Sequence, residues 1–554
     1  MLTLSILQTL VFSWAVCSLM SSSSSPYEFH ALALVTTPDH RHDEDCKAEE
    51  DTSTTSTNSG SCHARESGSN SNSPKLETIL SNLHTHKLYI NGTWTSSSSS
   101  SASASDESQT FTVLDPSTSF PITTIASASK EDVNRAVQAA TDALPAWSKK
   151  TLSERLDHLT QLMELYEERW EDFSILISAE MGAPIDFARE SQVGGGMYVM
   201  KTFMDILQNG IFEFERTIPR SEHDDDGDKT TMIFMEPIGV VGMITPWNWP
   251  LYQVLLKVIP ALAVGCTCIL KPSELSPLSA LLLTDLIDEA QFPHGVFNLI
   301  NGDGGVVGHE LASHPGTDMT SFTGSTGAGR IVSKAGAETF KRVSLELGGK
   351  GAFIVFADVN KAVNDDDSGN HNNFMDDRSV TLAEAIGHCV EGCFGNSGQS
   401  CNAPTRLLVE RSVYTQAIEM ARQVALEFTV GSAHEEGDHI GPVVSQLQFD
   451  KIQEYIRIGI QEGARLIIGG LGKEENIRGS AGTSSAGYYV RPTIFADCTS
   501  SMTIMKEEIF GPVLCIIPFD SQAEAIAIAN DTPYGPTNYV YSRDHSNEAW
   551  QQER

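Results

Sequence analysis

The stretch Ile238-Gly-Val-Val-Gly-Met-Ile-Thr245, closed by Pro246, decides the fold class. Short apolar runs that end at a proline are typical of parallel strands buried on both faces of a sheet. The chain after it alternates between helical and extended patterns, with a helix expected over 250–264, a strand over 267–271, a helix over 278–289 and a strand over 296–300. Strands and helices in turn predict an α/β protein with a doubly wound sheet.

Upstream of this stretch we expect a hairpin and two helices. Residues 130–147 and 151–180 carry apolar side chains three and four positions apart, which predicts amphipathic helices. The segments 87–94 and 111–116 are expected to form the first folded hairpin, and Asn91-Gly92 is a turn signal. The folded part of the chain therefore starts near residue 85.

The first 84 residues have a different composition. Residues 21–84 are rich in Ser, Thr, Asp, Glu and Asn, which bury too little apolar surface to offset chain entropy, so we expect them to be disordered. Residues 1–20 are uncharged and mostly apolar, which favours a secretory or organellar targeting segment. A membrane anchor is the first alternative, and an extension without function on a cytoplasmic protein is the second.

Composition excludes several classes of function. With 37 basic and 72 acidic residues among 554, the net charge is −35, which argues against a nucleic-acid partner and against adsorption to anionic lipid. Ten cysteines are too few for a disulfide scaffold. The i, i+4 pair Cys389 and Cys393, together with Cys401, could hold zinc geometrically, but no fourth ligand stands at a suitable spacing. The histidines and cysteines of the tail match no zinc template, so we expect no metal.

Two segments have the composition of ligand-binding loops. Residues 322–330, FTGSTGAGR, follow an expected strand and open a helix, so the glycines allow close approach of a pyrophosphate while Ser325 or Thr326 caps the helix. An ordinary capped turn fits this segment as well. Lys271-Pro-Ser-Glu274 follows a strand at the edge where α/β sheets bind ligands. Lys271 and Glu274 either hold ribose hydroxyls or form a surface ion pair.

Candidate reactive groups occur later in the chain. Gly398-Gln-Ser-Cys401 places a thiol after a glycine-containing loop, which fits a nucleophile, although single cysteines are more often inert core residues. Glu346 lies within the apolar segment 345–349, where burial would raise its pKa and make it a usable base. A structural carboxylate is the alternative for Glu346. Glu507 and Glu508 add carboxylates before a turn.

Taken together, these motifs resemble the aldehyde dehydrogenase superfamily. Six segments match in the family's order: Glu236–Asn248 (EPIGVVGMITPWN), Lys271–Glu274 (KPSE), Phe322–Thr326 (FTGST), Leu345–Gly349 (LELGG), Gly398–Cys401 (GQSC) and Glu508–Pro512 (EIFGP). The resemblance covers about residues 85–550. It implies a Rossmann-like NAD-binding domain over 85–345, which includes part of an oligomerisation hairpin, and an α/β catalytic domain over 346–554.

The resemblance also implies an activity and its residues. The expected reaction is the NAD(P)-dependent oxidation of a small-molecule aldehyde to the carboxylic acid through a thiohemiacetal and a thioester. Cys401 is the implied nucleophile, Asn248 holds the oxyanion together with the Cys401 N–H, and Glu346 activates the water. NAD is favoured over NADP because Glu274 repels a 2′-phosphate. The implied cofactor-binding residues are Thr245, Pro246, Trp247, Lys271, Ser273, Glu274, Gly324, Ser325, Thr326, Leu347, Glu508 and Phe510.

Two departures from the family pattern lead to further expectations. The stretch Asn364–Arg378 is longer than the family usually has there, and its Asp/Asn-rich composition predicts an exposed loop. Pro536 replaces a common Leu, and the family pattern continues beyond Tyr534-Gly535 into segments absent before Arg554. We therefore expect an incomplete catalytic domain without the closing oligomerisation strand, although the family forms homo-oligomers. An impaired relative that acts as a binding or structural protein is the alternative function.

Overall fold

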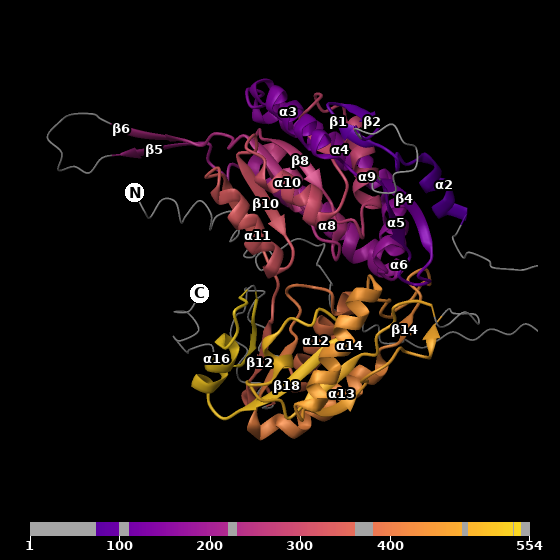
Figure 1. The fold of residues 1–554 in the computed structure, drawn as a ribbon. Helices are drawn as coiled ribbons and strands as arrows, with labels where there is room; N and C mark the ends of the chain where they lie inside the picture. The colour runs from indigo at the N-terminus through magenta and orange to yellow at the C-terminus, as the bar shows by residue number, and fades with distance from the viewer. Residues whose placement is uncertain are drawn as a thin grey trace, which may run out of the picture.

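The run that ends at Thr245 forms a central strand of a seven-stranded sheet in the computed structural model (Figure 1). Strands β11, β10, β7, β8 and β9 are parallel, and the β1–β2 hairpin is added antiparallel beside β9. The chain runs outward from β7 in both directions, so the topological switch lies between β7 and β10. In sheet order the strands are β11 (Arg342–Glu346), β10 (Met319–Thr323), β7 (Val240–Ile244), β8 (Thr267–Lys271), β9 (Phe297–Leu299), β1 (Leu88–Ile90) and β2 (Thr93–Thr95).

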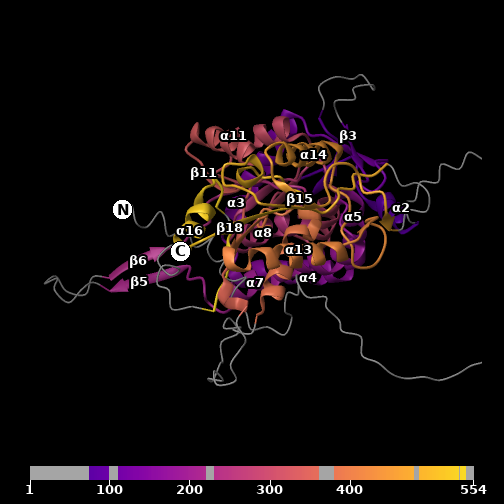
Figure 2. The ribbon, with the colours of Figure 1, turned by 90° about the horizontal axis from the view of Figure 1, so that it is seen from below.

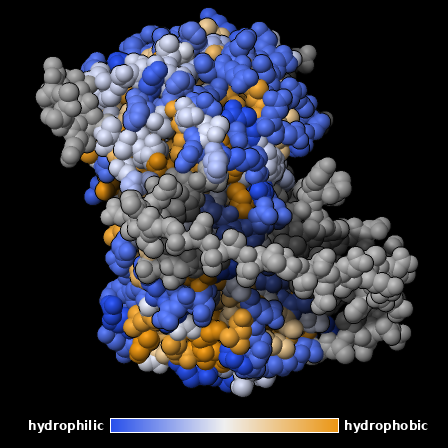
Figure 3. Space-filling model, turned by 90° about the vertical axis from the view of Figure 1, so that its right-hand side faces the viewer, coloured by the Kyte–Doolittle hydropathy of each residue, from blue (hydrophilic) through white to orange (hydrophobic). Residues whose placement is uncertain are grey.

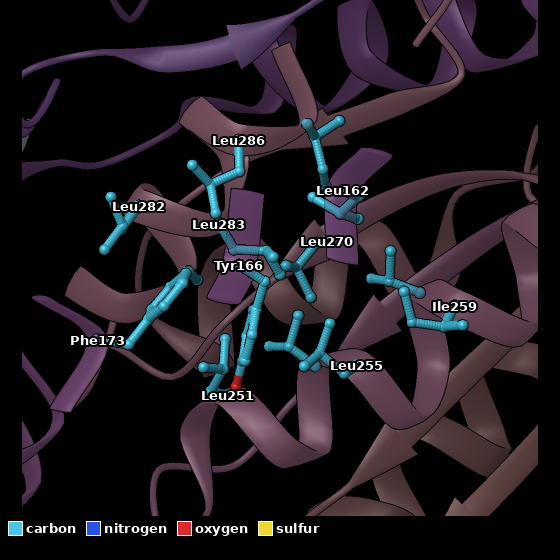
Figure 4. Close-up of a cluster of buried hydrophobic side chains, with 14 of the residues drawn as sticks. Leu162, Tyr166, Phe173, Leu251, Leu255, Ile259, Leu270, Leu282, Leu283 and Leu286 are labelled. Carbon is cyan, nitrogen blue, oxygen red and sulfur yellow. The ribbon is translucent and has the colours of Figure 1, made fainter. Parts of the chain in front are cut away.

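Helices cover both faces of this sheet, which confirms the doubly wound prediction. Figure 4 shows Leu and Ile side chains of α4, α8 and α9 packed around Tyr166 and Phe173 against Leu270 of β8. The helices are α2 (Pro74–Asn82), α3 (Lys130–Trp147), α4 (Leu152–Glu168), α5 (Trp170–Met181), α6 (Ile185–Phe187), the π-helix η2 (Ala188–Val193), α7 (Gly194–Gln208), α8 (Pro250–Ala263), α9 (Leu278–Glu289), the π-helix η3 (Gly304–Gly308), α10 (His309–Ser313) and α11 (Thr326–Ala337).

A second lobe is built on a six-stranded sheet, seen below the first in Figure 1. In sheet order its strands are β15 (Arg465–Ile468), β17 (Thr493–Ala496), β18 (Val513–Phe519), β13 (Arg406–Glu410), β12 (Ala352–Val355) and β19 (Tyr539–Tyr541). Only β15 runs antiparallel to its neighbour. Its other elements are η4 (Ala357–Asn360), α12 (Leu382–Phe394), η6 (Gly395–Gly398), η7 (Arg411–Val413), α13 (Tyr414–Glu427), β14 (Val430–Gly431), α14 (Gln446–Gln461), β16 (Ile477–Arg478), α15 (Thr503–Lys506) and α16 (Gln522–Asn530).

The structure describes residues 74–98, 110–219, 230–360, 380–478, 486–535 and 537–543. The apolar segment 1–20, most of the polar tail, the loop Asn364–Arg378 and Pro536 lie outside these residues. In the described ranges, no helix combines the length and apolar character needed to cross a membrane. Within the same ranges, no group of three His, Cys, Asp or Glu side chains is placed to hold a metal ion.

Two expectations about the first part of the chain are wrong. The expected disordered tail includes α2, whose Leu76 and Ile79 are buried in the core of the first lobe. The average composition of the tail is polar because of its serine-rich neighbours. An average does not reveal two apolar side chains that become buried through tertiary contacts. The expected hairpin is replaced by two: β1 pairs with β2, and β3 (Thr110–Leu114) pairs with β4 (Pro121–Ala126). Asn91 and Gly92 both have positive φ, so the first hairpin closes in two residues.

The segments β5 (Glu215–Pro219) and β6 (Thr230–Phe234) form an antiparallel arm that extends away from the first lobe (Figures 1 and 2). Met232, Phe234 and Met235 of this arm are exposed. The space-filling view in Figure 3 shows a surface that is mostly hydrophilic, with apolar side chains gathered on the second lobe. The arm thus exposes three large apolar side chains to solvent.

Candidate active site

The loop before Cys401 has an unusual backbone. After α12 ends, Asn396, Ser397 and Gly398 all have positive φ, at 53°, 56° and 72°. For the two residues other than glycine this conformation costs about 1–3 kcal/mol each, so the surroundings must hold it. The Ser397 hydroxyl donates to the Gly441 carbonyl at 2.8 Å, and a Cβ on Gly398 would collide with the backbone of Gly511. The loop is thereby fixed from two sides, with Cys401 at its end.

The side chain of Asn248 reaches this loop from the other lobe. Asn248 lies just before α8, is 4% exposed, and donates through Nδ2 to the Gln399 carbonyl at 2.8 Å. The main-chain carbonyl of Asn248 accepts hydrogen bonds from Gln192 Nε2 at 3.1 Å and from Asn396 Nδ2 at 3.0 Å. The second hydrogen of the Asn248 amide remains for a further acceptor next to the nucleophile loop.

The Cys401 thiol lies in a negative environment. The pKa of Cys401 is raised to about 11, mainly by burial and then by the charges of Glu508 and Glu346, while the backbone N–H groups of Cys401 and Asn402 act to lower it. The thiol is therefore mostly protonated at neutral pH and needs a base or a nearby positive charge to react.

Glu346, the last residue of β11, is more exposed than its apolar neighbours suggested. The protein around its carboxyl nevertheless raises the pKa of Glu346 by desolvation, and the charge of Lys257 opposes this. Lys257 lies buried on α8. Its pKa is lowered to about 8, because the effect of burial outweighs the opposing effect of the Glu346 charge. A carboxyl with a raised pKa beside a lysine with a lowered one is a pair suited to accepting and passing on protons.

The carboxyl edge of the first sheet carries the residues expected for a ribose. Lys271 ends β8, is 2% exposed, and forms an ion pair with Glu274 at 2.8 Å. The Ser273 hydroxyl accepts from the Leu275 N–H at 3.2 Å, so it orders the turn rather than facing outward. At the end of β7, the buried Thr245 hydroxyl has no hydrogen-bond partner among the described residues.

The glycine-rich segment is a capped helix start, as predicted. Ser325 is the N-cap of α11 and accepts from the Ala328 N–H at 3.2 Å. The Gly324 N–H donates to the Glu346 carbonyl at 3.0 Å, which places this helix start directly beside the proposed base. Helix α11 starts at Thr326, directly after β10 and therefore next to the switch between β10 and β7, and the N–H groups of a helix start suit an anion.

The Glu508 segment closes the edge from the second lobe. Glu508 Oε1 accepts from the Gly349 N–H at 2.8 Å, and a Cβ on Gly348 would collide with the Glu508 carboxylate. Burial raises the pKa of Glu508. The ring of Phe510 meets that of Trp247 edge to face at 5.4 Å. Both rings are half-buried; Trp247 follows the end of β7, and Phe510 belongs to the second lobe.

The structure therefore brings the predicted residues to one region between the lobes. Leu347 packs against Gly329 of α11, and Pro246 and Trp247 follow β7 at the same edge. Sequence reasoning missed Gln192, Lys257 and Gln399, which hold or face Asn248 and Glu346. Gly395-Asn-Ser-Gly398 could have signalled the tight loop, because Asn, Ser and Gly favour turns, whereas nothing local marks Gln192.

Comparison with known proteins decides the family. The profile described as the aldehyde dehydrogenase family matches residues 103–366 and 367–552. The chain belongs to the aldehyde dehydrogenase family. A curated relative, 3-succinoylsemialdehyde-pyridine dehydrogenase of a Pseudomonas species, is 40% identical over 457 residues, which are 82% of this chain and 86% of that protein.

Solved structures agree with this assignment. The crystal structure of aldehyde dehydrogenase from Bartonella henselae has a TM-score of 0.73 and 46% identity, and the match covers 83% of this chain and 88% of that one. A cysteine-to-alanine mutant of aldehyde dehydrogenase C from Pseudomonas syringae, in complex with NAD+ and octanal, has a TM-score of 0.73 and 40% identity over 84% and 86% of the two chains. This aldehyde dehydrogenase thus shares its two-lobed fold with enzymes crystallised with a nicotinamide cofactor.

Proposed function

We propose that this aldehyde dehydrogenase oxidises an aldehyde to the carboxylic acid with NAD and that Cys401 is the nucleophile. The observation that carries the proposal is the meeting of three groups from three segments: the Cys401 thiol, the Asn248 amide at its loop, and the Glu346 carboxylate, whose charge acts on the thiol. Nucleophile, oxyanion donor and base are the set that acyl chemistry on a thiol needs.

The residues at the carboxyl edge fit NAD. The partnerless buried hydroxyl of Thr245 and the free N–H groups at the start of α11 are donors suited to a pyrophosphate. Lys271 and Glu274 suit the hydroxyls of one ribose and Glu508 those of the other, while Trp247 and Phe510 form a wall. Bound NAD would supply the hydride acceptor. Solved neighbours that were crystallised as complexes with NAD+ support this choice.

The protein groups would act in two half-reactions. First, the Cys401 thiol gives up its proton to solvent and the thiolate attacks the aldehyde carbon, while the free Asn248 amide hydrogen and the Cys401 N–H stabilise the oxyanion that forms. Once the hydride has been passed on and a thioester remains, Glu346 takes a proton from a water that attacks the acyl carbon. The acyl C–S bond then breaks, which releases the acid and leaves Cys401 as a thiolate. Lys257 lies where its charge tunes the proton affinity of Glu346.

The steady-state test removes the nucleophile. Cys401→Ala should abolish NADH formation from an aldehyde such as octanal, because the thioester can no longer form. The matched control is Cys266→Ala, which removes a buried thiol from the connection between α8 and β8 and should keep most of the activity. If both variants and the unaltered protein form no NADH with any aldehyde, the chain is instead an impaired relative that acts by binding.

We propose further that the protein forms a homo-oligomer through the β5–β6 arm. Support comes from the exposed Met232, Phe234 and Met235 on an antiparallel pair that projects from the first lobe. An exposed two-stranded ribbon is marginally stable alone and gains from a partner sheet or surface. Size-exclusion chromatography with light scattering should give a mass above the 60.1 kDa of one chain, and Phe234→Glu should shift it toward the monomer.

A further inference from the structure

Two buried thiols of the second lobe lie against each other, apart from the reacting groups described above. Cys498 follows β17 and is 3% exposed, and Cys515 lies on β18 and is fully buried. The two strands are neighbours in the sheet, and the Cys498 N–H donates to the Ile516 carbonyl at 3.2 Å. Both side chains belong to the same apolar core, where the two thiols are in hydrogen-bond contact. Two thiols in contact need only a small movement to form a disulfide.

A buried cation without a partner lies beside this pair. Lys350 is 2% exposed, and among the described residues no group forms a hydrogen bond with its Nζ. An unpaired ammonium inside a protein is costly, so a nearby anion stabilises it. The groups whose charges act on Lys350 include the thiols of Cys515 and Cys393. Lys350 therefore suits a thiolate on Cys515 as its counter-ion.

Cys515 is the thiol of the pair that its surroundings favour as a thiolate. The pKa of Cys515 is lowered from its ordinary value, chiefly by a hydrogen bond from Cys498. Burial acts to raise this pKa, but the charges of Lys350 and Arg406 lower it further. By contrast, burial raises the pKa of Cys268 on β8, and no described cation opposes that rise. Because the thiolate is the form that reacts with peroxides, Cys515 is the preferred target.

The pair also encloses part of the proposed cofactor site. A bond between Cys498 and Cys515 would close a loop of the chain that contains α15, Glu508 and Phe510. A sulfur–sulfur bond is about 2.05 Å long, which is shorter than any non-bonded contact between two thiols, so its formation draws the ends of this loop together. Glu508 accepts a hydrogen bond from the Gly349 N–H at 2.8 Å. A shift of the loop should therefore disturb the position of the Glu508 carboxylate.

We propose that Cys498 and Cys515 form a peroxide-responsive disulfide that weakens the binding of NAD, an inference that rests on the cofactor site proposed above. The Cys515 thiolate first attacks one oxygen of a hydroperoxide such as hydrogen peroxide: an S–O bond forms, the O–O bond breaks and the departing hydroxide takes up a proton. The Cys498 sulfur then attacks the sulfenic sulfur, so that an S–S bond forms and the S–O bond breaks. The hydroxide leaves as water with the Cys498 proton. The thiols lose two electrons, which reduce hydrogen peroxide to two waters.

The test uses the Cys401→Ala variant, in which oxidation of the proposed nucleophile cannot contribute. The protein is treated with hydrogen peroxide, its free thiols are alkylated, and a digest is analysed by mass spectrometry. We expect peptides linked through Cys498 and Cys515. Titration with NAD, followed by protein fluorescence, should give a dissociation constant at least about 5-fold higher than that of the reduced protein. Dithiothreitol should reverse both changes.

Two further variants in the same background serve as comparisons. Cys498→Ser should remove the linked peptides and the change in NAD affinity, while the reduced protein still binds NAD as before. Cys268→Ser is the matched control, because Cys268 is also fully buried, and it should keep both responses.

Two outcomes overturn the inference. One is the absence of linked peptides at a peroxide dose that oxidises Cys401 in the unaltered protein. The other is the presence of linked peptides with no change in NAD affinity. The linkage is measured without cofactor, so failure of the proposed function is recognised separately, as no binding of NAD by the reduced protein.

Discussion

At the scale of single residues, this site depends on charges placed in partly desolvated surroundings. Lys271 is buried and pairs with Glu274, whose side chain is 37% exposed at the same edge. A carboxylate in that position accepts ribose hydroxyls and repels a 2′-phosphate. We therefore expect a preference for NAD over NADP that rests mainly on the Glu274 side chain.

Glu274→Gln should narrow the difference between the dissociation constants for NAD and NADP about tenfold, because the repulsion of the 2′-phosphate is removed while a hydrogen-bond acceptor remains. Titration of both cofactors by protein fluorescence measures the change. Glu289→Gln, at the exposed end of α9, is the control for a lost surface charge. Tighter binding of NADP than of NAD by the unaltered protein would contradict the role given to Glu274.

The candidate site residues could be chosen from sequence motifs, whereas the residues that contact them could not. The segments around Asn248, Glu346 and Cys401 each have a distinctive local pattern. The partners of these residues come from distant segments: Gln192 lies 56 residues before Asn248, and Lys257 approaches Glu346 from a different element. Such partners are set by tertiary packing, which a single sequence without aligned relatives does not reveal.

At the scale of elements, the predicted α3, α9 and β8 occur with the expected bounds, because their apolar periodicity agrees with their packing. The helix expected over 151–180 is instead two helices. The break falls at Arg169, where φ is −103° and ψ is 18° and no Gly or Pro marks the position. The π-helix η2 was also not predicted, since a sequence window has no signal for one extra residue in a turn.

The π-helix η2 should matter for catalysis because it places Gln192 against Asn248. Gln192→Met keeps the volume but removes the donor to the Asn248 carbonyl. We expect kcat to fall by about 10- to 100-fold with a small change in KM, because a displaced oxyanion donor weakens the transition state more than substrate binding. Steady-state kinetics with a thermal unfolding control decide this. An unchanged kcat with a lower Tm would mean that Gln192 is only structural.

At the scale of the whole molecule, the segment after β3 fastens the two lobes together. The Ala433 N–H donates to the Ser117 hydroxyl at 3.0 Å, and the Tyr489 hydroxyl donates to the Ser117 carbonyl at 3.1 Å. His434 pairs with Asp115 at 2.9 Å across the same junction. Burial lowers the pKa of His434, but the hydrogen bond and charge of Asp115 outweigh this and raise it. The junction should therefore respond to pH.

A raised pKa means that the folded protein holds the His434 proton more tightly than the unfolded chain does. The stability from this pair is fully present below the ordinary histidine pKa and is lost as the pH rises through the raised value. His434→Gln should therefore lower Tm by roughly 1–3 °C at about pH 6, and the difference should shrink at about pH 9. Scanning calorimetry at both pH values measures this. A difference that grows with pH would contradict the assignment.

We propose that Cys401 forms the thioester and that Glu346 activates the water that hydrolyses it. A rapid-mixing trace of NADH absorbance with the Glu346→Gln variant tests these separate roles most directly. If Glu346 mainly activates water, attack and oxidation proceed while thioester hydrolysis stalls, giving a burst of about one NADH per site followed by slow turnover. Glu338→Gln, a charge change just after α11, should keep steady turnover. Absence of a burst, with slow NADH formation from the first turnover, would contradict the account.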